Sequence, residues 1–197
     1  MSFLRRRMAS DSFKDDNQNW DIVWDYTMGL PEDNGFILSR NGAHEICEIT
    51  DDGLHVKSLY SGTTSRYIIS DYRKCNEGII EAKVKIISAG SINEGFIMML
   101  SNDGIKGTHI RISLSNNKGL LRYNEANSYV STNNYLDLNI DYIIKIVMKS
   151  NINYVYLNNN LVYQSEISST NFVTDNRFLF QNIGEWYLKY IKFKKLS

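Results

Sequence analysis

The stretch Gly78–Ser88, GIIEAKVKIIS, decides the fold class of this chain. Its apolar residues occupy every second position, with Glu81, Lys83 and Lys85 between them. Successive side chains of a β-strand point to opposite faces, so this pattern predicts a strand with one buried and one solvated face. Thr108–Ser115, THIRISLS, alternates in the same way. Both stretches therefore predict strands at the surface of a hydrophobic core.

Ten more short strands are predicted around these two. Gly95–Ser101, GFIMMLS, is apolar on both faces, which is typical of a strand near the middle of a sheet or under a loop. The other nine are Phe36–Ser39, Glu45–Thr50, Leu54–Leu59, Leu120–Asn124, Ile140–Lys149, Asn153–Leu157, Leu161–Glu166, Phe178–Gln181 and Trp186–Lys194. Asp52-Gly53 and Asn158-Asn159-Asn160 are expected to form hairpin turns. No helical period is long enough to connect parallel strands, so we expect an all-β fold, an antiparallel two-sheet jelly-roll sandwich.

The composition excludes several function classes. The 197 residues fit one domain with a short appendage, and 22 Lys and Arg balance 22 Asp and Glu. A neutral chain has no overall field that draws it to nucleic acid, so we expect no nucleic-acid partner. No apolar run approaches the roughly 18 residues of a membrane-spanning helix, and the N-terminus lacks the order of a signal peptide. Two cysteines are too few for a disulfide framework.

Residues 1–34 differ from the rest and are predicted to form an N-terminal arm, with the sandwich over residues 35–197. Tryptophans and acidic residues dominate this arm. A short helix over Asp16–Thr27 would place Trp20 and Trp24 on one face, available to a partner. The alternative is that both indoles cover one end of the sandwich core. The run Arg5-Arg6-Arg7 is expected to be solvated or used in assembly.

Two resemblances follow from these stretches. The order of the GIIEAKVKI, GFIMML and THIRISL strands and the late YVYLNNNLVYQ hairpin resembles concanavalin A-like lectin and glucanase domains over residues 35–197. The stretch DIVWDYTMGLPEDNGF, residues 21–36, looks like the beginning of minor structural or tail-associated proteins of phages and prophages of Gram-positive bacteria. This second resemblance implies a virion component or a surface-binding appendage, found in the virion or, before assembly, in the bacterial cytoplasm.

The chain lacks the catalytic strand of related hydrolases. Glycoside hydrolases of the resembling fold share a Glu-x-Asp-x-x-Glu or Glu-x-Asp-x-Glu strand, and no such strand occurs here. We therefore expect no enzyme. Asn102-Asp103 and Asp137-Leu138-Asn139 could supply hard oxygen ligands for calcium, but loops of this sort are usually turns, so we expect no metal site and no cofactor. One alternative is a glycan-cleaving enzyme whose carboxylates come from separate strands, for instance Glu81, Glu94, Glu125 or Glu185. Another is a purely structural virion protein that binds no sugar.

Residues suited to sugar binding are plentiful. A pyranose needs an aromatic plane for its C–H face and planar polar groups for its hydroxyls. His109 and Arg111 project from the polar face of their predicted strand, which either offers hydrogen-bond donors to a sugar or is an ordinary solvated sheet face. The full predicted ligand-binding set is His109, Arg111, Tyr123, Tyr154, Tyr156, Arg66 and Trp186, with Tyr60, Tyr67, Tyr129, Arg122, Asn124 and Glu185 as further candidates. The predicted function is carbohydrate binding or a structural role, with bacterial surface glycan and other virion subunits as partners and homo-oligomerisation raising weak affinities.

Overall fold

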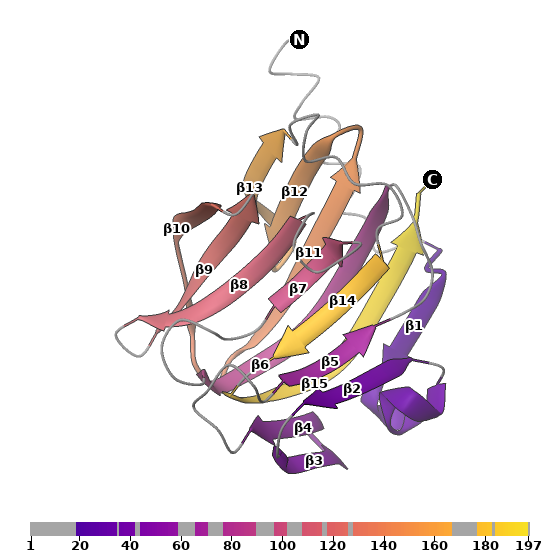
Figure 1. Ribbon diagram of the computed structural model, residues 1–197. Coiled ribbons are helices and arrows are strands. Elements are labelled where there is room, and N and C mark those ends of the chain that lie inside the picture. Colours follow the sequence, from indigo (N-terminus) through magenta and orange to yellow (C-terminus); the bar gives the residue numbers. More distant parts are fainter. Residues whose placement is uncertain are drawn as a thin grey trace.

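The computed structural model shows two β-sheets packed face to face (Figure 1). It describes residues 19–34, 36–41, 44–58, 66–70, 77–89, 97–101, 108–115, 118–125, 128–166, 177–182 and 184–196. Side chains are described for residues 19–34, 36, 46–57, 77–88, 136–166 and 184–196. Every strand pair in both sheets is antiparallel, which confirms the expected two-sheet sandwich.

The eight-stranded sheet has the order β13-β12-β11-β6-β15-β4-β3, and β1 pairs with the far half of β15. Its strands are β1 (Ile22–Asp25), β3 (His44–Thr50), β4 (Gly53–Ser58), β6 (Gly78–Ala89), β11 (Asp141–Lys149), β12 (Ile152–Leu157), β13 (Asn160–Glu166) and β15 (Gly184–Lys195). The two longest strands, β6 and β15, lie side by side at its centre.

The seven-stranded sheet has the order β10-β9-β8-β7-β14-β5-β2 and lies in front of the other sheet in Figure 1. Its strands are β2 (Ile37–Asn41), β5 (Arg66–Ser70), β7 (Ile97–Ser101), β8 (Thr108–Ser115), β9 (Lys118–Glu125), β10 (Ser128–Asp137) and β14 (Arg177–Asn182). The strand that is apolar on both faces, β7, is the central one, as its sequence predicts.

The sequence patterns missed three strands, β1, β5 and β10. β1 and β5 have only four and five residues, too few for alternation to stand out. β10 contains the polar run Ser131-Thr132-Asn133-Asn134, where its register with β9 is irregular. A polar interruption of this kind resembles a loop in sequence, because Asn and Ser are common in turns.

The core lies between the two sheets. Alternate residues Ile80, Ala82, Val84 and Ile86 of β6 are at most 5% exposed, which confirms the alternation predicted for this strand. They pack with residues of β11 and β15, of which Trp186 is the largest. Burial of one large apolar side chain is worth about 1.5–3 kcal/mol, so this layer supplies much of the driving force for folding.

Both predicted hairpins form. β3 and β4 are joined through Asp51 and Asp52, and Gly53 opens β4 with φ of +130°. A Cβ atom at Gly53 would lie 2.8 Å from the carbonyl oxygen of Leu188, so both the backbone angle and the available space require glycine. The β12–β13 turn holds Asn158 and Asn159 at positive φ, a conformation that asparagine tolerates.

The described part of the predicted arm joins the sandwich. Residues 22–25 form β1 rather than a helix, and Trp24 enters the main core with no exposed surface. Trp20 packs instead in a separate cluster on the other side of the eight-stranded sheet. The two indoles therefore do not share a face, which corrects the helical expectation. Residues 1–18 lie outside the described part, and the boundary at residue 34 stays a prediction.

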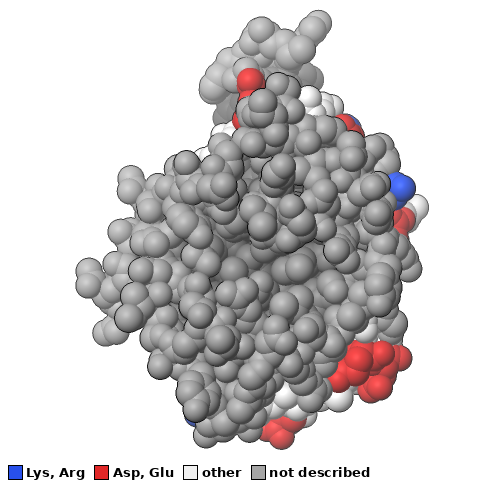
Figure 2. All heavy atoms as spheres, in the orientation of Figure 1, with Lys and Arg blue, Asp and Glu red and all other residues white. Residues whose placement is uncertain are grey.

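Acidic side chains gather over the segment that follows β1. Two 3-10 turns, η1 (Tyr26–Met28) and η2 (Pro31–Asn34), continue the chain there. Figure 2, in the orientation of Figure 1, shows a group of acidic side chains over this segment. In the described residues, no helix is long and apolar enough to cross a membrane.

Candidate functional site

Leu136 fixes which face of the seven-stranded sheet points to the core. Its side chain is 1% exposed and packs in the core cluster, whereas the next residue, Asp137, is exposed. In the register, Leu136 lies across from Gly119, which lies across from Leu114. Directly paired residues share a face of a sheet, so Leu114 belongs to the inner face. Because successive residues of a strand point to opposite faces, the faces of all the remaining residues of β8 and β9 follow from this assignment.

One apolar row crosses the sheet on this inner face. From β10 to β2 the paired residues are Val130, Tyr123, Ile110, Met98, Phe180, Ile69 and Leu38. The row has the composition of a core layer. Tyr123 belongs to this row, so the register places it on the face opposite to that of His109 and Arg111.

The outer face of β8 and β9 is polar. His109 lies across from Asn124, and Arg111 lies across from Arg122. Tyr129, on β10, lies across from Asn124 and continues the first of these two rows. The structure thus brings two predicted site residues, His109 and Arg111, together with three of the further candidates, Arg122, Asn124 and Tyr129.

The middle of the same outer face is apolar. Met99 of β7 is paired with both His109 and Leu179, and Ile97 is paired with both Arg111 and Gln181. A polar pair of strands therefore borders an apolar strip. Carbohydrates present apolar C–H faces and polar hydroxyl rims, and this combination of residue types suits both.

Arg66 occupies the same outer face but lies farther away. It opens β5 and is paired with Asn41, and alternation places it on the face of Ile68, which is paired with Gln181. β5 is three strands from β8, or about 14 Å at the usual spacing. Arg66 therefore belongs to the same surface without being adjacent to Arg111.

Three other predicted residues are in the eight-stranded sheet and are buried. Trp186 has no exposed surface and packs in the main core, because its position in β15 faces the other sheet. Tyr154 and Tyr156 are 4% and 1% exposed, and both pack with Ile79 and Val147 on the opposite side of β12. A stacking platform needs an accessible ring face, so these three residues leave the candidate set.

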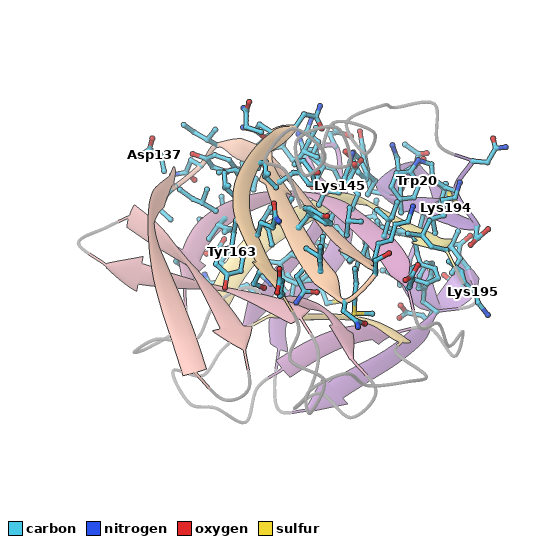
Figure 3. The ribbon with its side chains drawn as sticks, turned by 90° about the horizontal axis from the view of Figure 1, so that it is seen from above. Trp20, Asp137, Lys145, Tyr163, Lys194 and Lys195 are labelled. Carbon is cyan, nitrogen blue, oxygen red and sulfur yellow. The ribbon has the colours of Figure 1, made fainter. Side chains whose placement is uncertain are left out.

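On the outer face of the eight-stranded sheet, charged side chains of its own strands form ion pairs with one another. Glu81, 3% exposed, lies with its Oε2 atom 2.9 Å from Lys145 Nζ, and the hydroxyl of Tyr190 donates to its Oε1 atom at 3.0 Å. Lys192 approaches the same carboxylate at 3.6 Å. Figure 3 shows Lys145 on the side of the sheet away from β8 and β9. The predicted solvated role of Glu81 is thus corrected, because Lys145 lies across from it in the β6–β11 register.

A second ionic group lies near β4 on this face. His55 Nε2 is 3.0 Å from Glu185 Oε1, and the imidazole stacks on Tyr187 with ring centroids 4.4 Å apart. Lys57 approaches the other oxygen of Glu185 at 3.8 Å. Two basic side chains thus contact the Glu185 carboxylate.

Asp141 anchors a third ion-pair group. Partial burial alone would raise the pKa of its carboxyl, but Lys189 at 2.8 Å and Lys83 at 3.5 Å outweigh that effect and lower the pKa below its ordinary value. Asp141 is therefore ionised throughout the neutral range and supports the fold there. In the described residues, no group of three or more His, Cys, Asp or Glu side chains is placed to hold a metal ion.

The four carboxylates considered for catalysis do not meet in the described part of the chain. Glu81 and Glu185 lie on the outer face of the eight-stranded sheet in the groups just described. Glu125 ends β9 in the other sheet, and its side chain lies outside the described residues. Glu94 is also outside them.

No protein-family model matches this sequence, and no curated protein matches it. Solved structures do share its fold. A laminarinase catalytic domain from Thermotoga maritima superposes with a TM-score of 0.65 at 12% identity, covering 91% of this chain and 99% of that one. A structure reported for endo-acting O-glycanases of the human gut microbiota gives a TM-score of 0.66 at 9% identity, covering 91% of this chain and 100% of that one. A carbohydrate-binding module from Bacillus subtilis gives 0.55 at 15% identity, covering 82% of this chain and 96% of that one.

These similarities show the fold, a jelly-roll sandwich of concanavalin A-like type. They also correct one expectation. The chain was expected not to be an enzyme because it lacks the acidic strand motif, but its fold extends over essentially the whole of a laminarinase catalytic domain. Absence of that motif therefore does not exclude catalysis, and the expectation is withdrawn.

Proposed function

We propose that this domain binds carbohydrate on the outer face of the seven-stranded sheet. The observation that carries the proposal is the β8–β9 register, in which His109, Arg111, Arg122 and Asn124 occupy one face beside the apolar positions of β7. Donor-rich and apolar positions side by side suit the two kinds of surface that a sugar presents. The burial and ion pairing of the eight-stranded sheet favour the same choice of face. Known carbohydrate-binding and glycan-cleaving domains of this fold add support.

A polysaccharide retardation experiment tests this proposal. The purified chain is run through native gels that contain laminarin, other soluble polysaccharides or bacterial wall polymers. We expect slower migration in at least one polymer, and loss of that retardation in the His109→Ala variant. Lys194→Ala, on the opposite sheet, is the matched control and is expected to migrate as the parent does. Unchanged migration in every polymer tested would overturn the proposal.

Glycan cleavage is the second candidate function. It is favoured by the match to a laminarinase catalytic domain over 99% of that domain. A reducing-end assay on the retained polymer distinguishes the candidates. Release of reducing ends by the purified chain, absent from a heat-denatured sample, would assign the domain to the enzymes. Retention without release would leave binding as its activity.

We further propose that the domain serves as a surface-binding component of a phage or prophage tail, with bacterial surface glycan as ligand and assembly with other subunits. The support is the resemblance of residues 21–36 to tail-associated proteins. Several copies on one particle would raise weak single-site affinity through avidity. Localisation in the virion follows from this proposal. Co-sedimentation of the chain with purified particles is the expected result, and its absence from particles that are otherwise complete would contradict the role.

A further inference from the structure

The net charge of this chain is zero, but its basic and acidic residues are distributed unevenly between the two sheets. The strands of the seven-stranded sheet contain six Lys and Arg residues, Arg40, Arg66, Arg111, Lys118, Arg122 and Arg177. Within those same strands the carboxylates are Glu125 and Asp137 alone. The strands of the eight-stranded sheet hold more carboxylates, namely Asp25, Glu45, Glu48, Glu81, Asp141, Glu166 and Glu185.

Most of these cations share one face. Alternation from the register places Arg66, Arg111, Lys118, Arg122 and Arg177 on the outer face, and Arg40 on the inner one. Asp137 is paired with Lys118 at the end of β9, about 13 Å along the strand from Arg122. Glu125 falls on the inner face by the same alternation.

Arg111 and Arg122 occupy directly paired positions of β8 and β9. Like charges directly opposite each other destabilise a sheet, so folding alone does not favour this pairing. The remaining positions of their row in the described strands are Ser131, Ile97, Gln181, Ile68 and Ser39, none of which is acidic. A negatively charged ligand would offset the repulsion between the two guanidinium groups. Both groups can donate hydrogen bonds to the oxygens of a carboxylate or a phosphate.

We propose that the carbohydrate bound on this face is acidic, a polymer that carries carboxylate or phosphate groups, and that Arg111 and Arg122 together recognise its anion. This inference rests on the proposed carbohydrate-binding function and adds the ligand class. His109 and Asn124, one row away on the same face, bind the neighbouring hydroxyl groups. The apolar positions of β7 receive the C–H face of the sugar.

Binding is measured by titration calorimetry with three probes: polygalacturonate for carboxylate, poly(glycerol phosphate) for phosphate, and laminarin as the neutral control. We expect at least one anionic polymer to bind more tightly than laminarin, with an affinity that falls as salt rises. Arg111→Gln and Arg122→Gln are each expected to weaken anionic binding about tenfold or more, because each removes a charge-assisted contact. Lys194→Gln removes one charge from the opposite sheet and is expected to change little.

The outcomes separate this inference from the proposed function. No binding of any polymer would refute the proposed function itself. Laminarin bound as tightly as both anionic polymers, or an unchanged anionic affinity in both arginine variants, would refute the acidic ligand alone. Preference for polygalacturonate or for poly(glycerol phosphate) identifies the anion. Arg111→Lys keeps the charge but loses the planar fork, so an intermediate affinity supports recognition by geometry as well as charge. Thermal unfolding of each variant confirms that it is folded.

Discussion

Replacement of Lys145 by Met tests how the outer face of the eight-stranded sheet is stabilised. Lys145 and Glu81 have side chains that are 2% and 3% exposed, and their charged atoms are 2.9 Å apart. Removing one member of a buried ion pair typically costs about 3–5 kcal/mol, because it leaves the other charge buried without compensation. Glu81 keeps the hydroxyl of Tyr190 at 3.0 Å and Lys192 at 3.6 Å, so we expect the lower end, about 3 kcal/mol.

The assay is urea unfolding followed by tryptophan fluorescence and circular dichroism. In a parallel thermal unfolding experiment, the same loss of about 3 kcal/mol corresponds to a fall of roughly 6–12 °C in Tm for a chain of this size. The double variant Glu81→Leu with Lys145→Met replaces the pair by apolar groups and is expected to recover most of the lost stability. A loss below about 1 kcal/mol for Lys145→Met would refute the reasoning, as it would mean that the pair is solvated.

Two further predictions concern backbone and charge. Gly53→Ala is expected to destabilise the fold by about 1–3 kcal/mol, because Gly53 has a φ of +130° and the added Cβ would lie 2.8 Å from the Leu188 carbonyl oxygen. Gly29→Ala has open space around it and is the milder control in the same unfolding assay. Equal losses of stability in the two variants would contradict the steric argument. Asp141→Asn is expected to cost about 0.5–1 kcal/mol at pH 7, a modest value because the side chain is 31% exposed. The native pKa of Asp141 is lowered by Lys189, so its contribution is present above the unfolded pKa near 3.9 and disappears as pH falls through the native value. An Asn variant that remained equally destabilised at pH 2 would contradict that origin.

The alternation in β6 was enough to predict its inner face correctly, since Ile80 and Val84 are buried as their spacing requires. The same alternation failed for Glu81, which looked like part of a charged exterior. Its burial depends on Lys145, 64 positions later, and on Tyr190 near the end of the chain. Periodicity within one strand carries no information about which strands become neighbours. The contacts of Glu81 with Lys145 and Tyr190 therefore could not be predicted from the sequence.

The candidate site also combines residues that can be predicted from one strand with residues that depend on how strands pair. His109 and Arg111 could be chosen from their own strand, because the polar side of THIRISLS is visible in the sequence. Arg122 and Asn124 belong beside them only because the β8–β9 turn sets the register that pairs them. A one-residue shift of that register would have placed Tyr123 on the outer face instead. Tyr154 and Tyr156 were selected for their alternation with Val155, but alternation does not reveal that both sides of β12 are covered.

The most direct test of the account is to locate the bound polymer on the protein by NMR. Chemical shifts of backbone amides and of arginine Nε–H groups are followed while the acidic polymer that binds best is added. The account predicts the largest changes at the Nε–H groups of Arg111 and Arg122 and along β8 and β9. Changes confined to β11, β12 and β15, or an absence of changes at saturating polymer, would contradict the claim that the seven-stranded sheet binds carbohydrate.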